Sequence, residues 1–344
     1  MRYAVLFGGS SFEHEISIVS AIVLKDRLKS DLLFIFLDKN RDFYLIDKKN
    51  MKSKYFSSGE YKNSTKVMLK NGGFFQKGIL GEKSIDFDTV LNLIHGRDGE
   101  DGKIASFLDF YKISYIGPRV EASVISFNKY FTKMFAKEIG LGVLDYQIIK
   151  KDDIKPLIFD YPVILKPLRL GSSIGVNIVR EEIELSYALD VAFEFDNEVL
   201  VEPFIEGIKE FNLAGCKANE FIFSIIEEPK KGDFLDFNKK YLDFSRDKKV
   251  EPAQIPDDLE NRLKETFKKI YDPLFCGAII RCDFFVKNGD IYLNEINPVP
   301  GSLANYLFDN LDDVLSRLSS YIPKERDIVI DYRYINSIQG MKNK

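Results

Sequence analysis

The chain has 344 residues, 45% of them hydrophobic and 30% charged, with a net charge of −4 at pH 7. This composition is typical of a soluble globular protein of two or three subdomains, and the negative charge argues against a nucleic-acid partner. The apolar start, Tyr3–Phe7, is too short for a signal peptide or a membrane span. Cys216, Cys276 and Cys282 lack metal-type spacing, which fits a reducing compartment. We therefore expect a cytoplasmic protein without a membrane or nucleic-acid partner.

The first hundred residues alternate between predicted strands and helices. Strands are predicted at Tyr3–Phe7, Leu32–Leu37 and Asp88–Ile94. Helices are predicted at Glu15–Leu28 and from Lys103 onward, and the polar stretch Asp38–Ile85 predicts short strands and loops. This alternation predicts an open, mostly parallel α/β sheet.

The rest of the chain predicts two α+β subdomains, which we place at residues 119–205 and 206–344, after a first domain of residues 1–118. Helices are predicted at Phe127–Ile139, Glu181–Phe193, Leu259–Tyr271 and from Asn305. Strands are predicted at Pro162–Pro167, Val176–Val179, Glu198–Glu202, Phe211–Cys216 and Ile222–Glu227. A charged loop at Lys230–Lys249 separates the last of these strands from the helix that follows.

The stretch Gly277–Leu303 carries the most informative chemistry. It predicts two adjacent strands that end in polar residues, with Arg281 beside Asp283 and Glu295 beside Asn297 on one strand face each. The side-chain oxygens of Asp283, Glu295 and Asn297 are hard ligands of the kind that Mg²⁺ prefers. The neighbouring Arg281 guanidinium can bind the negative charge of a phosphate. A hairpin with a charged outer face is the alternative.

Two further segments are typical of a nucleotide site. The loop Lys166–Gly175 combines glycines, serines and a lysine, which together can hold phosphate, although a plain turn is the alternative. The apolar strand Glu198–Glu202 ends in an acid that can accept from an adenine amino group, or can simply lie on the surface. Neither a Walker A motif nor a G-x-G-x-x-G fingerprint is present, which argues against an NAD-type oxidoreductase.

Taken together, the motifs resemble the ATP-grasp superfamily and, within it, the D-alanine–D-alanine ligase family. The matching blocks are Phe7–Ser17, Leu93–Gly102, Ile116–Lys129, Val163–Val176, Val199–Phe204, Lys239–Tyr241, Arg281–Phe285 and Tyr292–Gly301. Their order and spacing both fit. The resemblance implies an ATP-grasp fold, in which an N-terminal open parallel α/β domain is followed by two α+β subdomains that clasp ATP.

The resemblance also implies which residues bind the nucleotide and the metal. The phosphate contacts fall to Lys129, Lys166, Gly171, Ser172, Ser173 and Lys240. The adenine and ribose contacts fall to Glu202, to the backbone near Phe204 and Ile205, and to Glu210. Two Mg²⁺ or Mn²⁺ ions are expected on Asp283, Glu295 and Asn297.

For the amino-acid substrates, the resemblance implies that Glu13 binds the ammonium of the first D-alanine, with His95 nearby. Ser172 and Tyr241 are expected to form a hydroxyl network with Glu13. Arg281 and the backbone N–H of Gly301 are expected to stabilise an oxyanion. Two other residues, Tyr306 and Leu307, fall where the family binds the second substrate's carboxylate.

The expected activity is the ATP-dependent ligation of two D-alanines through a D-alanyl phosphate, for peptidoglycan synthesis, by a homodimer. The alternatives are ligation of D-alanine to D-serine or D-lactate, and a nucleotide binder without turnover. The chain departs from the family pattern at Pro203, at Pro298 and in Ser302–Leu307, which affects adenine contacts and the second subsite.

Overall fold

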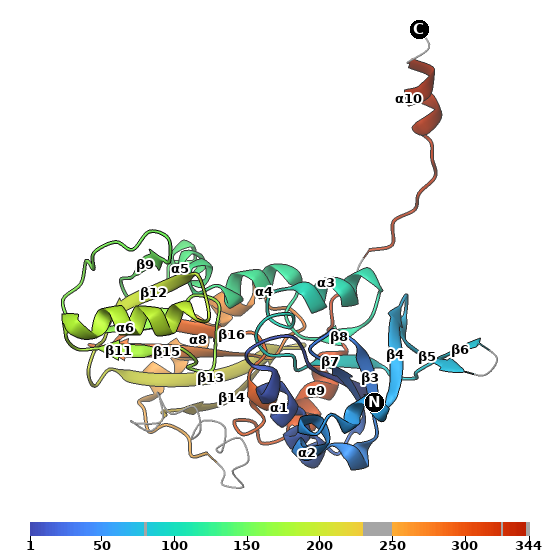
Figure 1. Ribbon diagram of the computed structural model, residues 1–344, viewed down its shortest axis with the longest axis horizontal. Coiled ribbons are helices and arrows are strands. Elements are labelled where there is room, and N and C mark those ends of the chain that lie inside the picture. The colour runs from blue at the N-terminus through green and yellow to red at the C-terminus, as the bar shows by residue number, and fades with distance from the viewer. Residues whose placement is uncertain (79–80, 230–249, 325, 342–344) are drawn as a thin grey trace.

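In the part of the chain that the structure describes, three β-sheets follow one another, each built from its own segment (Figure 1). The structure is a computed structural model and describes residues 1–78, 81–229, 250–324 and 326–341. Within these ranges the first sheet has eight strands, and the second and third have four each. The candidate site lies where the loops of these three sheets meet.

The first sheet has a parallel half and an antiparallel half. The parallel half has the order β2-β1-β7-β8 and consists of β1 (Arg2–Gly8), β2 (Asp31–Leu37), β7 (Thr89–Asn92) and β8 (Tyr115–Ile116). The antiparallel half consists of β3 (Phe43–Ile46), β4 (Thr65–Lys70), β5 (Gly73–Gly78) and β6 (Gly81–Ser84). The predicted parallel arrangement is thus confirmed for the strands that are joined by helical crossovers. The short strands predicted within Asp38–Ile85 extend the same sheet with antiparallel pairing, which short connections allow.

Strand β1 is buried on both faces because a helix covers each of them. Tyr3, Val5 and Phe7 pack in the core that contains buried residues of α1 (His14–Arg27). Ala4 and Leu6 face the opposite way, into the core that contains residues of α3 (Lys103–Phe110). Alternation of side chains along a strand makes this possible, and it explains why β1 is an uninterrupted apolar run.

The second sheet has the order β11-β10-β12-β9 and is antiparallel. Its elements are β9 (Gln147–Lys150), β10 (Val163–Pro167), β11 (Asn177–Val179), β12 (Glu198–Pro203) and the covering helix α6 (Glu182–Phe193). The predicted helix at Phe127–Ile139 is wrong at its start, because Asn128 interrupts it. Its side-chain oxygen accepts from the amides of Tyr130 and Phe131, which ends α4 (Val120–Phe127) and starts α5 (Lys129–Glu138).

The third sheet has the order β14-β13-β15-β16 and contains the predicted hairpin. Its elements are β13 (Lys209–Lys217), β14 (Phe221–Glu227), β15 (Ile280–Lys287), β16 (Asp290–Asn297) and the packed helix α8 (Asp257–Tyr271). The predicted closing helix from Asn305 is wrong: α9 spans Leu311–Ser319, with the Asn310 side chain accepting from the Asp313 amide. Ser302, Leu303 and Ala304 have φ values of 48°, 53° and 53°, so the preceding segment is not an α-helix.

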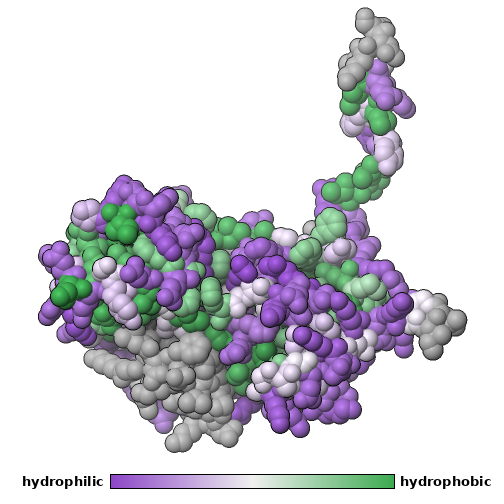
Figure 2. Space-filling model, viewed as in Figure 1, coloured by the Kyte–Doolittle hydropathy of each residue, from purple (hydrophilic) through white to green (hydrophobic). Residues whose placement is uncertain are grey.

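The C-terminal segment leaves the body and ends in the short helix α10 (Ile335–Met341), as Figure 1 shows. In Figure 2 hydrophobic residues are visible along this projecting segment. They include Ile328 and Val329, whose exposed fractions are 85% and 88%. None of the helices in the described ranges combines the length and the apolar composition that crossing a lipid bilayer requires.

Candidate active site

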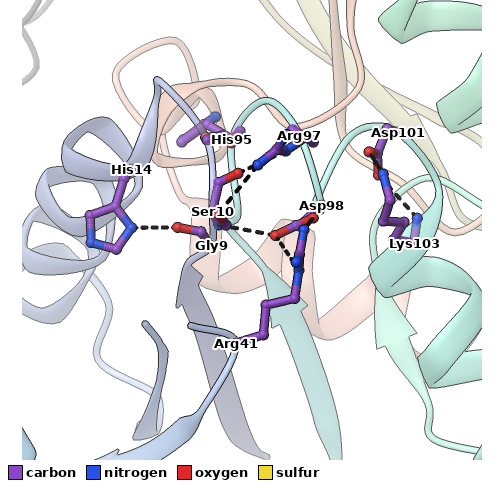
Figure 3. A network of polar contacts seen from close by, with 10 residues as sticks. Gly9, Ser10, His14, Arg41, His95, Arg97, Asp98, Asp101 and Lys103 are labelled. Atoms are coloured by element: carbon purple, nitrogen blue, oxygen red, sulfur yellow. Dashed lines mark hydrogen bonds and ion pairs between the residues drawn. The ribbon is translucent and has the colours of Figure 1, made fainter. Parts of the chain in front are cut away.

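The turn after β1 and the loop after β7 are tied together by polar contacts, and they form one wall of the site (Figure 3). The Ser10 amide donates to Asp98 Oδ2 at 3.0 Å, and Arg97 Nε donates to the Ser10 carbonyl at 2.9 Å. Arg41 pairs with the buried Asp98 at 2.9 Å. These contacts fix the start of α1 against residues 95–103, and Glu13 lies at that start.

Glu13 is buried, with 3% of its surface exposed, and its carboxylate reaches the second subdomain. Its Oε1 accepts a hydrogen bond from the Ser172 hydroxyl. Its Oε2 is buried and has no hydrogen-bond partner among the described residues. Burial, and then the nearby Glu100 carboxylate, raise the pKa of Glu13 to about 7, although Ser172 opposes the shift. The site therefore holds a carboxylate oxygen that is oriented but unsatisfied.

Two glycines make room for this carboxylate. A Cβ atom on Gly96 would lie 2.6 Å from Glu13 Oε2, and one on Gly171 would lie 3.0 Å from Glu13 Oε1. Both distances are shorter than ordinary van der Waals contact, so a side chain at either position would displace Glu13 or its neighbours.

His95 lies near Glu13 as predicted, but its ring is engaged elsewhere. His95 Nε2 is 3.0 Å from the Ser20 hydroxyl, and burial lowers the pKa of the imidazole to about 4, which keeps it neutral at pH 7. His95 Nδ1 lies 3.7 Å from Glu100, whose pKa burial raises to about 8. Glu100 was missed as a site residue, although it lies in the Leu93–Gly102 block that the sequence singled out.

The glycine-serine loop after β10 crosses the site from the second subdomain. Ser172 and Ser173 both have left-handed φ values, 59° and 58°, a conformation that non-glycine residues adopt rarely. The Lys129 ammonium donates to the carbonyl of Leu170, which anchors the loop to α5. Below the loop is a small cavity of about 30 Å³, lined among others by Glu100, Lys129, Gly171, Glu295 and Asn297. Gly171 of the predicted clasp, Lys129, and Glu295 and Asn297 of the hairpin thus face one space.

Glu202 is a buried charge. This excludes the alternative that the strand simply ends in an acid on the protein surface. Glu202 is 1% exposed, and its two carboxylate oxygens lie 2.6 Å from Lys133 Nζ and 2.7 Å from Lys166 Nζ. Burial alone would raise the pKa of Glu202, but the two ammonium groups hold it below its usual value. Burial alone would also lower the pKa of Lys166, and Glu202 raises it. Lys166 Nζ donates further to Asn294 Oδ1 at 3.2 Å.

Lys133 was missed by the sequence analysis. It lies one helical turn after Lys129 on α5, and that spacing was the available signal. For the remaining nucleotide residues, Glu210 lies on β13 opposite Phe285. The Phe204 amide donates to the Pro162 carbonyl at 2.9 Å, and the Ile205 carbonyl accepts from Ile208, so this backbone is already partly committed.

The hairpin β15–β16 brings the predicted metal residues together. Asp283 is directly opposite Glu295, and Arg281 is directly opposite Asn297. Arg281 holds Asp283 through two hydrogen bonds of 2.7 and 2.8 Å, and Asn297 Nδ2 donates to Asp283 at 3.0 Å. Burial, with a contribution from Glu295, raises the pKa of Asp283, although the Arg281 guanidinium opposes this shift. Burial alone would lower the pKa of Arg281, but Asp283 raises it above its ordinary value.

This hairpin set fits a hard divalent cation. The buried Asp283 and the half-buried Glu295 face each other, so their like charges repel unless a cation lies between them, and an amide oxygen is beside them. Within the described ranges, no group of three or more histidine, cysteine, aspartate or glutamate residues has an arrangement that could hold a metal ion. A metal here would therefore depend on the two acids together with Asn297 and the ligand's own oxygens.

The segment after the hairpin differs from expectation. Gly301–Ala304 forms a short 3-10 turn. The Leu307 amide donates to the Ala304 carbonyl at 2.9 Å, so this amide is already engaged within the segment. The Tyr306 hydroxyl lies 3.3 Å from Arg281, and burial raises the pKa of this phenol to about 12. The Ser302 amide donates to Ser20 at 3.2 Å, a link to the first domain that the sequence analysis missed.

Two predicted residues, Lys240 and Tyr241, lie outside the described residues, as does the predicted lid at Lys230–Lys249. Of the expected network of Glu13, Ser172 and Tyr241, the described residues include the hydrogen bond from Ser172 to Glu13.

Comparison with known proteins gives the same family over both halves of the chain. Residues 2–118 match the family model "D-ala D-ala ligase N-terminus", and residues 135–311 match "D-ala D-ala ligase C-terminus". A D-alanine–D-alanine ligase of a Nitratiruptor species is 61% identical over 342 residues, which is 99% of this chain and 100% of that protein.

Solved structures agree. The crystal structure of D-alanine–D-alanine ligase from Helicobacter pylori has a TM-score of 0.85 and 52% identity, and covers 95% of this chain and 100% of that one. A VanG D-Ala:D-Ser ligase from Enterococcus faecalis has a TM-score of 0.73 and 26% identity, with 93% and 97% covered. The mixed α/β architecture is therefore the ATP-grasp arrangement that the motifs predicted.

Proposed function

The chain belongs to the D-alanine–D-alanine ligase family, and we propose on that premise that it joins two D-alanines into D-alanyl-D-alanine at the expense of ATP. The product serves peptidoglycan synthesis. The observation that supports the amino-acid role most directly is Glu13, a buried carboxylate with an unsatisfied oxygen under the clasp loop. A small amino acid brings the ammonium group that such an oxygen lacks.

Recognition of the first D-alanine begins at that oxygen. In the described part of the chain no lysine or arginine lies within ion-pair distance of Glu13, and Lys129 acts on it only from further away, so the substrate ammonium becomes its close counter-charge and keeps it ionised. Ser172 holds the other oxygen and connects the amino-acid subsite to the phosphate clasp. The substrate carboxylate is thereby directed toward the space below the clasp, where ATP presents its terminal phosphate.

The proposed nucleotide contacts come from both walls of that space. Lys129 and Lys166 are close to it and supply positive charge to the phosphate oxygens, while the clasp adds hydroxyl and amide donors. Glu202 accepts the adenine amino group, and Glu210 takes the ribose hydroxyls. The substrate carboxylate attacks the terminal phosphate, which gives a D-alanyl phosphate and ADP.

Asp283, Glu295 and Asn297 would hold the divalent metal of this site, with phosphate oxygens completing its ligands. When bound, Mg²⁺ or Mn²⁺ neutralises charge on the phosphates. Arg281 is held in place by two hydrogen bonds to Asp283. Its remaining donors and the Gly301 N–H stabilise the oxyanion that forms when the second D-alanine attacks the acyl phosphate. Phosphate leaves, and the dipeptide remains.

The three units at 1–118, 119–205 and 206–344, a homodimer and a cytoplasmic location complete the proposal. A D-alanine–D-serine ligase is the second candidate, because a solved protein of that name shares the fold at 26% identity. The higher identity to D-alanine–D-alanine ligases, 61% for one relative, favours D-alanine as the acceptor.

The experiment is a phosphate-release assay with ATP, Mg²⁺ and a panel of amino acids, with products identified by mass spectrometry. We expect release with D-alanine and formation of D-alanyl-D-alanine. Equal release with L-alanine, or no release with any D-amino acid, would refute the proposal. Mixed incubations of D-alanine with D-serine or D-lactate separate the alternatives by the mass of the product.

Arg281→Met tests the oxyanion assignment. We expect ATP to bind with little change and ligation to fall by about 10²–10³-fold, because the guanidinium is needed for charge that develops only during the reaction. Asp283→Asn should instead change the dependence of the rate on Mg²⁺ concentration. An Arg281→Met protein with normal ligation would contradict the assignment.

A further inference from the structure

Lys133 is a buried lysine for which the proposed reaction has no role. It lies on α5, and 2% of its surface is exposed. Lys129 precedes it by one helical turn and reaches the clasp loop, whereas Lys133 reaches the strand β12. One face of α5 thus sends one cation to each end of the nucleotide subsite.

The partner of Lys133 is the carboxylate of Glu202. Lys133 Nζ lies 2.6 Å from Oε1, and Lys166 Nζ lies 2.7 Å from Oε2, so two lysines share one acid. Lys133 also donates to the Leu144 carbonyl at 3.4 Å and lies 5.3 Å from the centre of the Tyr146 ring. These contacts come from the loop after α5 and hold Lys133 independently of the nucleotide.

The two lysines differ in what else they can reach. Lys166 is bonded to Asn294 on β16, next to the predicted metal residue Glu295, so phosphate can draw it away from Glu202. Lys133 faces the interior between α5, β12 and the Tyr146 loop. If Lys166 turns to phosphate, Lys133 is the cation that stays with Glu202, and a buried carboxylate without any cation is strongly unfavourable.

Glu202 can accept a further hydrogen bond. Its Oε1 is buried and has a second lone pair beyond the one that faces Lys133 Nζ at 2.6 Å. An exocyclic amino group of a purine is a donor that suits this oxygen.

We infer that Lys133 is a positioning residue for nucleotide selection: it holds Glu202 in place as an ionised acceptor for the adenine amino group while Lys166 serves the phosphates. The inference rests on the proposed ATP site. It assigns to Lys133 a role in the choice of base and none in the chemistry of ligation.

The test compares binding of ATP and ITP to the full-length protein by calorimetry, with Mg²⁺ and without amino acid. ITP has a carbonyl oxygen where ATP has the amino group, so it cannot donate to Glu202. We expect the wild-type protein to prefer ATP, and Lys133→Met to reduce the ratio of the two Kd values by about tenfold, mainly by weakening ATP. Lys133→Arg, which keeps the charge, should restore most of the preference.

Lys137→Met is the matched control, because Lys137 lies one turn further on α5, is exposed, and contacts the same Tyr146 ring at 4.8 Å. It should leave the ratio unchanged. In a Glu202→Gln background, Lys133→Met should have no further effect on the ratio, because Lys133 acts through that carboxylate. If Lys133→Met does not fold, Lys133→Gln replaces it with the same expected result.

Equal weakening of ATP and ITP would overturn the inference, because it would mean that Lys133 provides only charge or stability. An unchanged ratio, or a wild-type protein without preference for ATP, would overturn it as well. Because nothing turns over in this experiment, a failure of D-alanine ligation would count against the proposed function and leave this test valid.

Discussion

The two ends of the site both bury a carboxylate, but they balance its charge differently. At the nucleotide end, Glu202 lies between Lys133 and Lys166, and its pKa is held low. At the amino-acid end, Glu13 has a serine hydroxyl but no ion pair within the described ranges, and its pKa is raised to about 7. The chain supplies the counter-charge of Glu202 itself and leaves that of Glu13 to the ligand.

This difference has an energetic consequence. A buried carboxylate without a cation is destabilising, so the amino-acid end is strained until an ammonium arrives. Part of the binding free energy of the amino acid is then relief of that strain, and ligands without an ammonium obtain none of it. The nucleotide end carries no such strain and is organised before the ligand binds.

Replacing each carboxylate in turn tests this difference most directly. Glu202→Gln leaves two buried ammonium groups without their carboxylate and should lower the free energy of unfolding by about 3–5 kcal/mol. Glu13→Gln removes a charge that has no cation and should leave stability unchanged or slightly higher. Urea unfolding of the two variants at pH 7.5 measures both effects. Equal losses in the two proteins would show that the ends are balanced alike.

The pH dependence of stability should separate the two ends further. The folded-state pKa of Glu13 is about 7 and its ordinary value is 4.5, so between these values the folded protein holds a proton that the unfolded chain has lost. Stability from this group therefore falls as pH rises through the window, by on the order of 2 kcal/mol. Glu202, with a lowered pKa, adds no slope above pH 5.

The measurement is unfolding from pH 5 to 8 for the wild-type protein and for Glu13→Gln. Glu100, whose pKa is also raised, contributes a slope of the same sign, so the difference between the two curves measures Glu13 together with its coupling to Glu100. Parallel curves would show that Glu13 does not titrate in this range.

The hydrogen bond between Ser172 and Glu13 should have a smaller effect. Ser172→Ala removes the donor to Oε1 and should raise the KM for D-alanine by roughly tenfold, which corresponds to about 1–2 kcal/mol. Because Ser172 lowers the pKa of Glu13, its loss should also move the acid limb of amino-acid binding to higher pH. Ser57→Ala, at an exposed serine that ends α2 (Ser53–Ser57), is the control. If the pH dependence of D-alanine binding is the same in Ser172→Ala as in the wild-type protein, the hydrogen bond from Ser172 to Glu13 does not have the proposed role.

The smallest effect is expected at Gly171. A Cβ atom there would lie 3.0 Å from Glu13 Oε1, so Gly171→Ala should shift the carboxylate by a few tenths of an ångström and cost about 1 kcal/mol in amino-acid binding. The KM for D-alanine measures it. Gly340→Ala is the control, since a Cβ atom there meets nothing within 4 Å. An unchanged KM would mean that the carboxylate has room to move.

Much of the fold was predictable because its signals are local. The apolar run of β1, the hairpin β15–β16 and the helix α8 follow from strand alternation and helical periodicity within short windows. The start of α9 was misjudged although its signal is also local: Asn310 caps it, with Asp312 and Asp313 in its first turn. Ser302, Leu303 and Ala304 have left-handed backbone, and the helix begins only after them. None of the three is a glycine, so the residue types did not indicate this conformation.

The candidate site divides in the same way. The opposition of Asp283 and Glu295 follows from one hairpin register, and the resemblance to the family identified Glu13 and Ser172 from separate blocks of sequence. The pairing of Lys133 with Glu202 was not foreseen, because α5 and β12 are far apart in the chain and meet only in the folded subdomain.

By itself, the sequence determined most of the strands and helices, the hairpin acids and the family, since each depends on residue types at fixed short spacings. Only the tertiary structure decided which buried carboxylate forms ion pairs with lysines and which forms none. The charge state of a buried group depends on desolvation and on partners within a few ångströms, and those partners come from distant segments. Glu13 and Glu202 are the same residue type, and packing alone gives them opposite electrostatic environments.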